Sequence, residues 1–91
     1  MTTVRVSYGE TVSKNYQSKR EDFGFDFEVQ GGPESGNTIR RAKDLCQAMV
    51  KSALGVKLGK ARRELDGLAQ EFFSTSWHEL STGHQQQDEL L

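Results

Sequence analysis

The sequence is short of cysteine, proline and histidine and has no long hydrophobic run. Its single cysteine, Cys46, excludes an intramolecular disulfide, and apolar neighbours at helical spacing predict a buried thiol rather than a metal ligand or a nucleophile. No run approaches the roughly 18 apolar residues of a membrane-spanning helix, and the first residues contain no apolar signal-peptide core. We therefore expect a cytoplasmic protein in a reducing compartment, without a membrane partner.

Catalytic and cofactor-binding motifs are also missing. The two histidines, His78 and His84, do not have the i, i+4 spacing of a helical metal pair. Asp26 and Glu28 alternate along a strand, so a solvated face is expected there rather than a general acid and base. There is no Walker A loop, no dinucleotide-binding glycine motif and no nucleophile with an identifiable base. These absences favour a protein that is not an enzyme and takes no metal or cofactor.

Lysine and arginine are absent from the last third of the chain. Residues 1–63 hold all twelve of them together with seven acids, whereas residues 64–91 hold six acids and no Lys or Arg. This asymmetry suits a nucleic-acid binder whose acidic end competes for its basic surface. In the alternative interpretation, Lys and Arg solvate a helix face and the acidic tail is a solubilising end. The length allows one small domain, which we expect over residues 1–80, followed by a polar, acidic and mobile tail at 81–91.

The clearest pattern is a period of two over residues 22–29, where Phe23, Phe25, Phe27 and Val29 share one face. A shorter alternation over residues 3–8 predicts a first strand that pairs antiparallel with it. The connection, residues 9–20, is long for a hairpin. It is either a functional loop or a continuation of both strands into a projecting ribbon that turns near Lys14 and Asn15.

Apolar residues then recur at steps of three and four from Ile39 to Phe72, as in amphipathic helices. Ser35 or Asn37 is expected as the N-cap of the first helix, with Pro33 as an earlier candidate for its first position. One bent helix over residues 38–76 is possible, but we favour a break within residues 55–59, because each interior glycine costs about 1 kcal/mol relative to alanine.

The predicted fold class is therefore α+β: a two-stranded antiparallel ribbon followed by two helices or one long bent helix, completed by self-association. A lone two-stranded sheet is marginal in water, so helices or a second subunit must cover its apolar face. A homodimer is the simplest such assembly. Trp77, near the end of the helical half, is either a lid on the core or an exposed interface anchor.

The segment between the two strands contains aromatic, cationic and amide side chains close together. Aromatic rings stack on bases and cations meet phosphates in proteins that bind single-stranded nucleic acids. The same tyrosines are equally compatible with packing across a ribbon whose cations keep an exposed edge soluble. The candidate binding residues, for nucleic acid or for a protein partner, are Tyr8, Lys14, Asn15, Tyr16, Lys19 and Arg20, together with Arg40 and Arg41 of the first helix.

Residues 4–29 carry a resemblance. The run is Val6-Ser7-Tyr8-Gly9-x-Thr11-Val12-x-x-Asn15-Tyr16-x-Ser18, followed by Phe23-Gly24. It resembles the opening of small uncharacterised proteins of bacteriophages and other mobile elements, in which a β-hairpin with the pattern S-Y-G-x-T…N-Y-x-S precedes a helix. The chain departs from that pattern at Ser13-Lys14, where a Leu-Gly type of turn is common, and in its longer helical half. The resemblance implies a phage or mobile-element origin, hence a host cytoplasm, and assigns no activity.

Two functions from different classes follow. The first is nucleic-acid binding, to single-stranded DNA in a replication or recombination setting. The second is a protein-binding inhibitor or adaptor that blocks a host defence enzyme, for which a small protein without catalytic residues is suited.

Overall fold

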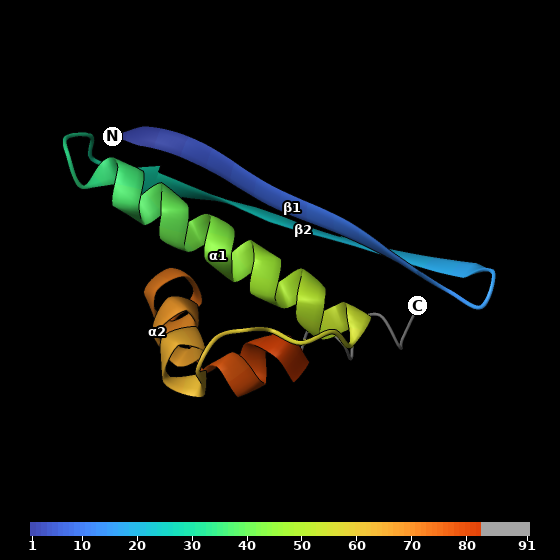
Figure 1. Cartoon of the computed structure of the whole chain (residues 1–91). Coiled ribbons are helices and arrows are strands. Elements are labelled where there is room, and N and C mark those ends of the chain that lie inside the picture. Colours follow the sequence, from blue (N-terminus) through green and yellow to red (C-terminus); the bar gives the residue numbers. More distant parts are fainter. Residues whose placement is uncertain (83–91) are drawn as a thin grey trace.

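A computed structural model of the chain describes residues 1–82 (Figure 1). Two antiparallel strands are followed by helices, which confirms the predicted α+β class. The predicted acidic tail lies outside the described residues from position 83 onward. No helix within residues 1–82 is long and apolar enough to cross a membrane. The elements are β1 (Thr2–Lys14), β2 (Gln17–Val29), α1 (Ser35–Leu54), α2 (Arg62–Phe73) and a short helical segment at residues 77–82.

The two strands form one long ribbon. They pair without interruption from Thr2 opposite Val29 to Lys14 opposite Gln17. The connection over residues 9–20 is therefore not a loop, and the alternative of a projecting ribbon is confirmed. Thirteen residues at about 3.3 Å each give a strand of about 43 Å, which accounts for most of the 47 Å long axis of the molecule.

Helix α1 covers the apolar face of the ribbon. The side chains of three cross-strand pairs lie on the inner face of the ribbon, which is the face towards α1, as the period of two predicts. These pairs are Val4–Phe27, Val6–Phe25 and Tyr8–Phe23. Val6 forms a buried cluster with Ala42 and Cys46 of α1. The prediction of a buried structural thiol at Cys46 is thus confirmed.

Helix α2 adds a second helical layer. Its buried positions join those of α1 in a core of Leu45, Ala48, Met49, Leu65, Leu68, Ala69 and Trp77. Phe72 and Phe73, at its end, reach the sheet, with ring centroids 5.4 and 5.0 Å from that of Phe25. Helices therefore cover the phenylalanine face within one chain, and the predicted self-association stays a prediction.

The helix break lies where it was favoured. Gly55 has a left-handed φ of 74°, its N–H donates to the Ser52 carbonyl, and the N–H of Val56 donates to the Lys51 carbonyl at 3.0 Å. This glycine-terminated end stops α1, so the continuous helix over residues 38–76 is wrong. The expected N-cap is also wrong, because Glu34 holds that position without a side-chain hydrogen bond.

A capping motif that we did not predict positions Trp77. Ser76 Oγ accepts a hydrogen bond from the N–H of Glu79, so Ser-x-x-Glu begins the helical segment at residues 77–82. The N–H of Trp77 donates to Asp66 Oδ1 of α2 at 2.9 Å, and the residue is only 6% exposed. Of the two interpretations of Trp77, the core lid is confirmed.

Candidate functional site

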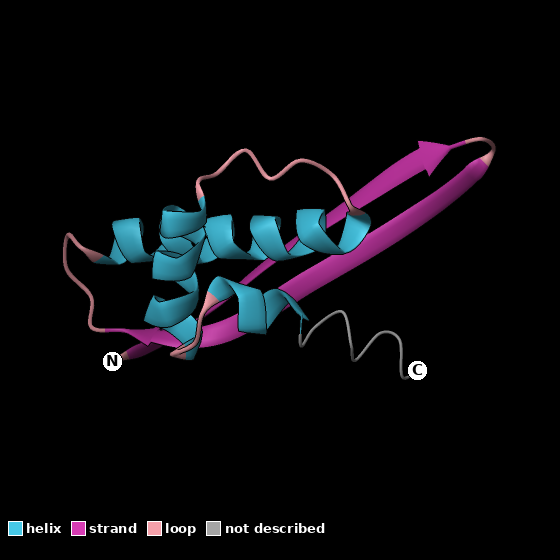
Figure 2. Cartoon of the chain, turned by 90° about the horizontal axis from the view of Figure 1, so that it is seen from below, coloured by secondary structure: helices cyan, strands magenta, loops and turns pink. Residues whose placement is uncertain are grey.

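The part of the ribbon beyond the helices is an arm, residues 11–20. The cross-strand pair Glu10–Glu21 follows the last pair of large apolar residues on the inner face, Tyr8–Phe23. Beyond the Glu10–Glu21 pair, every residue of the arm is exposed except Val12, which is half-buried. Figure 2 shows the hairpin end extending past the last turn of α1. The arm contains three cations, Lys14, Lys19 and Arg20, and no acid.

A group of polar contacts fixes the arm to the helices. Lys51 Nζ of α1 lies 3.2 Å from Glu10 Oε1, and the Tyr8 hydroxyl donates to the same oxygen at 2.5 Å. The hydrogen bond from Tyr8, together with that from Lys51, lowers the pKa of Glu10 below its ordinary value. Lys19 Nζ donates to the carbonyl of Ala53 in the last turn of α1 at 3.1 Å. Tyr8 therefore lies in this junction, and Lys19, although its side chain is 59% exposed, is the residue of the arm that is bonded to α1.

Asn15 and Tyr16 form the two-residue turn at the arm tip. Their φ angles are 53° and 65°, the left-handed pair of a type I′ turn, in which glycine is favoured at the second position. Tyr16 occupies that position and its side chain is fully exposed. A bulky residue in this conformation is uncommon and costs free energy. Lys14 adjoins the turn and is also exposed.

Arg20 lies on the outer face of the arm. Its guanidinium donates to both carboxylate oxygens of Asp22, at 3.1 and 3.0 Å, and to Thr11 Oγ1 at 3.3 Å. Because 61% of each charged side chain is exposed, this pair is screened by water and remains accessible to a ligand. Arg20 is thus placed beside the tip, but its charge is partly compensated.

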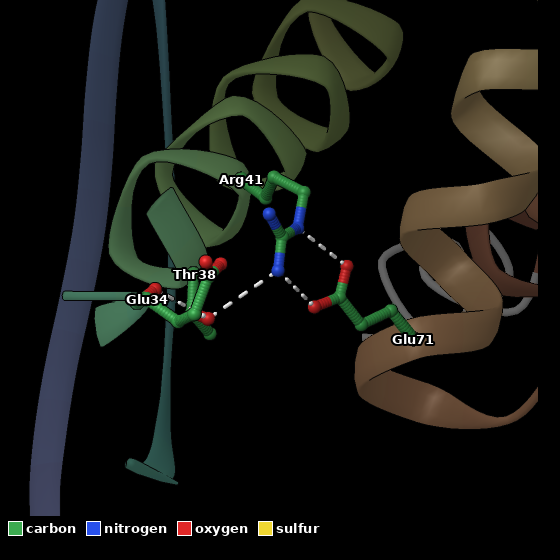
Figure 3. Close-up of polar contacts among 4 residues, drawn as sticks. All are labelled: Glu34, Thr38, Arg41 and Glu71. Carbon is green, nitrogen blue, oxygen red and sulfur yellow. Dashed lines mark hydrogen bonds and ion pairs between the residues drawn. The ribbon is translucent and has the colours of Figure 1, made fainter. Parts of the chain in front are cut away.

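The two arginines predicted from α1 lie apart from the arm. Arg41 donates through two nitrogens to the two carboxylate oxygens of Glu71 on α2, each at 2.9 Å, and to Thr38 Oγ1 at 3.3 Å (Figure 3). The hydrogen bond to Glu71 raises the pKa of Arg41. Arg40 is exposed on the same turn of α1. Both belong to the half of α1 distant from the arm tip (Figure 1).

The predicted residues therefore divide into three groups. Lys14, Asn15, Tyr16 and Arg20 share the arm, Tyr8 and Lys19 are in its junction, and Arg40 and Arg41 are elsewhere. Within residues 1–82, no three His, Cys, Asp or Glu side chains are placed to hold a metal ion. Comparison with protein-family models, curated proteins and solved structures finds no match. The function is thus inferred from the geometry of the arm.

Glu10 and Lys51 are the site residues that sequence reasoning missed. The signal was present, because Glu10 falls in the same alternating register as Val4, Val6 and Tyr8 and must therefore face inward. A carboxylate on an inward face requires a cationic partner. Only the position of the end of α1 identifies that partner as Lys51.

Proposed function

We propose that the protein is a non-catalytic nucleic-acid-binding protein that presents Tyr16 to an unpaired base, with Lys14 and Arg20 beside the neighbouring phosphates. The observation that carries this proposal is the exposed aromatic ring of Tyr16 in a left-handed turn position at the tip of a projecting arm. The amide of Asn15 adds a hydrogen-bond donor and acceptor next to the ring.

The conformation of Tyr16 supports a role for the ring itself. A left-handed residue other than glycine costs roughly 1–2 kcal/mol, and an exposed ring recovers none of this by burial. Strain of this kind concentrates at functional positions. Stacking of a base on an aromatic ring contributes about 1–3 kcal/mol, which is enough to offset the cost in the complex.

The ion pairs of the protein limit the number of phosphate contacts. Among the residues that the structure describes, seven lysines and arginines lie within 4.0 Å of a carboxylate: Arg5, Lys19, Arg20, Arg41, Lys51, Lys60 and Arg62. On the arm Lys14 is in none of these pairs, and the pair of Arg20 with Asp22 is exposed to water and can be exchanged for a phosphate. We therefore expect about two phosphates to be neutralised, by Lys14 and Arg20. For a single strand this predicts a slope of log K against log salt of about −1.4.

Fluorescence anisotropy of labelled oligonucleotides tests the proposal. Between about 50 and 200 mM salt, two phosphate contacts predict a loss of affinity of about sevenfold, with single strands preferred over duplexes. Lys14→Gln should reduce the magnitude of the slope by about 0.7. Lys43→Gln, which removes an exposed cation of α1, is the matched control and should leave it unchanged. Failure to bind either kind of oligonucleotide at low salt would overturn the proposal.

The same ion pairs favour a second candidate, a protein-binding inhibitor or adaptor. Compensated surface charges suit a protein partner, and an exposed tyrosine is a common anchor in a partner's pocket. Residues 4–29 resemble small proteins of bacteriophages and other mobile elements. For a protein of that origin, the partner would be a host defence enzyme in the host cytoplasm. This function would be favoured if a protein partner binds in the absence of oligonucleotide, and if replacing Tyr16 weakens that binding while replacing Lys14 does not.

A further inference from the structure

The ribbon has two free edges, and they differ in how well they are protected. Within residues 1–82 the sheet has only two strands, so each strand leaves one side unpaired. Natural proteins protect such edges with charged residues, prolines or bulges. In β2 six residues are charged: Lys19, Arg20, Glu21, Asp22, Asp26 and Glu28. In β1 only Arg5, Glu10 and Lys14 are charged, and most others are Thr, Val, Tyr or Ser.

Strand β1 is also regular over its whole length. Its thirteen residues pair one to one with those of β2, with no bulge and no proline. Thr, Val and Tyr are the residues that favour strands. An edge that is long, regular and weakly charged is a template for pairing with another strand.

The turn determines which residues of β1 face the free edge. A two-residue type I′ turn makes its flanking residues, Lys14 and Gln17, a hydrogen-bonded pair, and such pairs alternate with non-hydrogen-bonded pairs along the ladder. The even-numbered residues of β1 therefore bond to β2. The odd-numbered residues direct their N–H and C=O groups to the open edge, and they are Thr3, Arg5, Ser7, Gly9, Thr11 and Ser13.

The surroundings of Gly9 indicate which chain fits this edge. A Cβ atom at Gly9 would collide with the carboxylate of Asp22 and would lie 2.6 Å from Arg20 Nη2. The Asp22 carboxylate therefore extends from β2 over the backbone of β1 at Gly9. This carboxylate is paired with the Arg20 guanidinium, which lies over the same point, so the edge at Gly9 is crossed by a closed ion pair and has no side chain of its own. A strand that brings a long side chain opposite Gly9 therefore meets neither a bulky residue nor a free charge.

We propose that β1 pairs antiparallel with β1 of a second copy of this chain, about a two-fold axis at Ser7. In this register all facing odd-numbered residues are hydrogen-bonded pairs, and Arg5 of each copy lies opposite Gly9 of the other. Arg5 keeps its ion pair with Asp26 of its own chain, 2.7 Å between Nε and Oδ1. The facing pairs are then Thr3 with Thr11, Arg5 with Gly9 and Ser7 with Ser7, so no two like charges lie directly opposite each other. The result is a four-stranded sheet in the order β2-β1-β1-β2.

This assembly has two arms that point in opposite directions. Because the two β1 strands run antiparallel, the two copies of Tyr16 lie at opposite ends of the sheet. A ligand long enough to contact both arms would bind more tightly than one that contacts a single arm. The pairing itself requires only β1, so it is independent of what the arm binds.

Sedimentation velocity over about a hundredfold range of protein concentration tests the pairing. We expect a monomer–dimer equilibrium for the wild type. Ser7→Pro removes an edge-facing N–H and should abolish the dimer, and Ser7→Lys, which places two ammonium groups together at the axis, should weaken it at least tenfold. Glu28→Pro removes an edge-facing N–H of β2 and is the matched control, so its dimer should persist. Intensity of the single tryptophan reports whether each variant is folded.

Several results would overturn the proposal. A wild-type protein that is monomeric at every concentration would show that the edge does not pair with a second copy. A dimer that survives both Ser7 substitutions, or one lost only in Glu28→Pro, would place the interface elsewhere. If Ser7→Pro does not fold, Ser7→Lys decides, because Ser7 is exposed on the outer face.

Discussion

Arg41 and Glu71 join α1 to α2 through two parallel hydrogen bonds of 2.9 Å. Arginine and carboxylate have matching planar geometries, so this pair defines an orientation as well as a contact. The pair lies between the two helices, and Figure 3 shows the guanidinium also directed at Thr38 near the start of α1. An arginine predicted for nucleic-acid contact is therefore engaged within the protein.

Replacing Arg41 should affect folding and leave binding unchanged. Arg41→Gln and Glu71→Gln each remove this pair and should lower the urea midpoint. The decrease should be slight, because each side chain is more than a third exposed and water screens the pair. The double variant should lose less than the sum of the two single losses. Arg63→Gln on α2, which is exposed, is the control for stability. A weakened oligonucleotide affinity in Arg41→Gln would place this residue in the interface instead.

Leu45 is the core position whose truncation should cost most. It is fully buried between α1 and α2, so Leu45→Ala should lower the free energy of unfolding by about 2–5 kcal/mol. A domain of this size has a total stability of only about 5–10 kcal/mol. Lys43→Ala, exposed on the same helix, should change it by less than about 0.5 kcal/mol. Urea unfolding followed by the fluorescence of Trp77 measures both, and equal effects would contradict the described core.

Cys46 should be unreactive in the folded protein. Burial raises the pKa of its thiol to about 11, so about one thiol in a thousand is ionised at pH 8. A disulfide reagent should label it only after denaturant is added. In the unfolded chain the thiol ionises near pH 9. Between pH 9 and 11 this ionisation stabilises the unfolded state but not the folded one, so the free energy of unfolding should fall as pH rises through this range. Rapid stoichiometric labelling of the native protein would contradict this burial.

The junction of the arm should be sensitive to acid. The hydrogen bonds from Tyr8 and Lys51 keep the pKa of Glu10 below its ordinary value in the folded state. The contribution of the Glu10 carboxylate to stability is therefore complete above its ordinary pKa. This contribution is lost as the pH falls through the lowered pKa of the folded state. Carbon NMR of the carboxyl group should show the lowered pKa, and Tyr8→Phe or Lys51→Gln should raise it. An ordinary pKa in the wild type would show that the junction is open in solution.

The extent of the ribbon illustrates what the sequence does and does not specify. The period of two over residues 22–29 predicts the inner face, because burial of three phenylalanines requires it. Beyond Gly9 the apolar alternation weakens, so loop and ribbon were equally compatible with the sequence, and the continuous register decides between them. Likewise Gly55 indicated the helix end, because a left-handed C′ position favours glycine.

The ion pairs are where sequence reasoning failed. Arg20, Arg41 and Lys19 were predicted to bind nucleic acid or a protein partner. Arg20 pairs with Asp22 two positions along the same strand, which the sequence could have indicated, whereas the contacts of Arg41 with Glu71 and of Lys19 with Ala53 depend on how the helices pack. Glu71 is thirty positions from Arg41 in the sequence, and Ala53 is thirty-four from Lys19. No local pattern in the sequence indicates these two long-range contacts. Of the candidate binding residues, Lys14, Asn15 and Tyr16 are exposed together at the tip of the arm, and their role in binding stays a prediction.

Tyr16→Gly tests the central claim most directly, because the account predicts opposite effects on stability and on binding. Glycine relieves the left-handed strain, so the free energy of unfolding should rise by about 1 kcal/mol. Loss of the ring should weaken binding of a single-stranded oligonucleotide by about fivefold or more, while Tyr16→Phe retains affinity. A variant that is more stable and binds as the wild type does would show that the ring takes no part in recognition and would contradict the account.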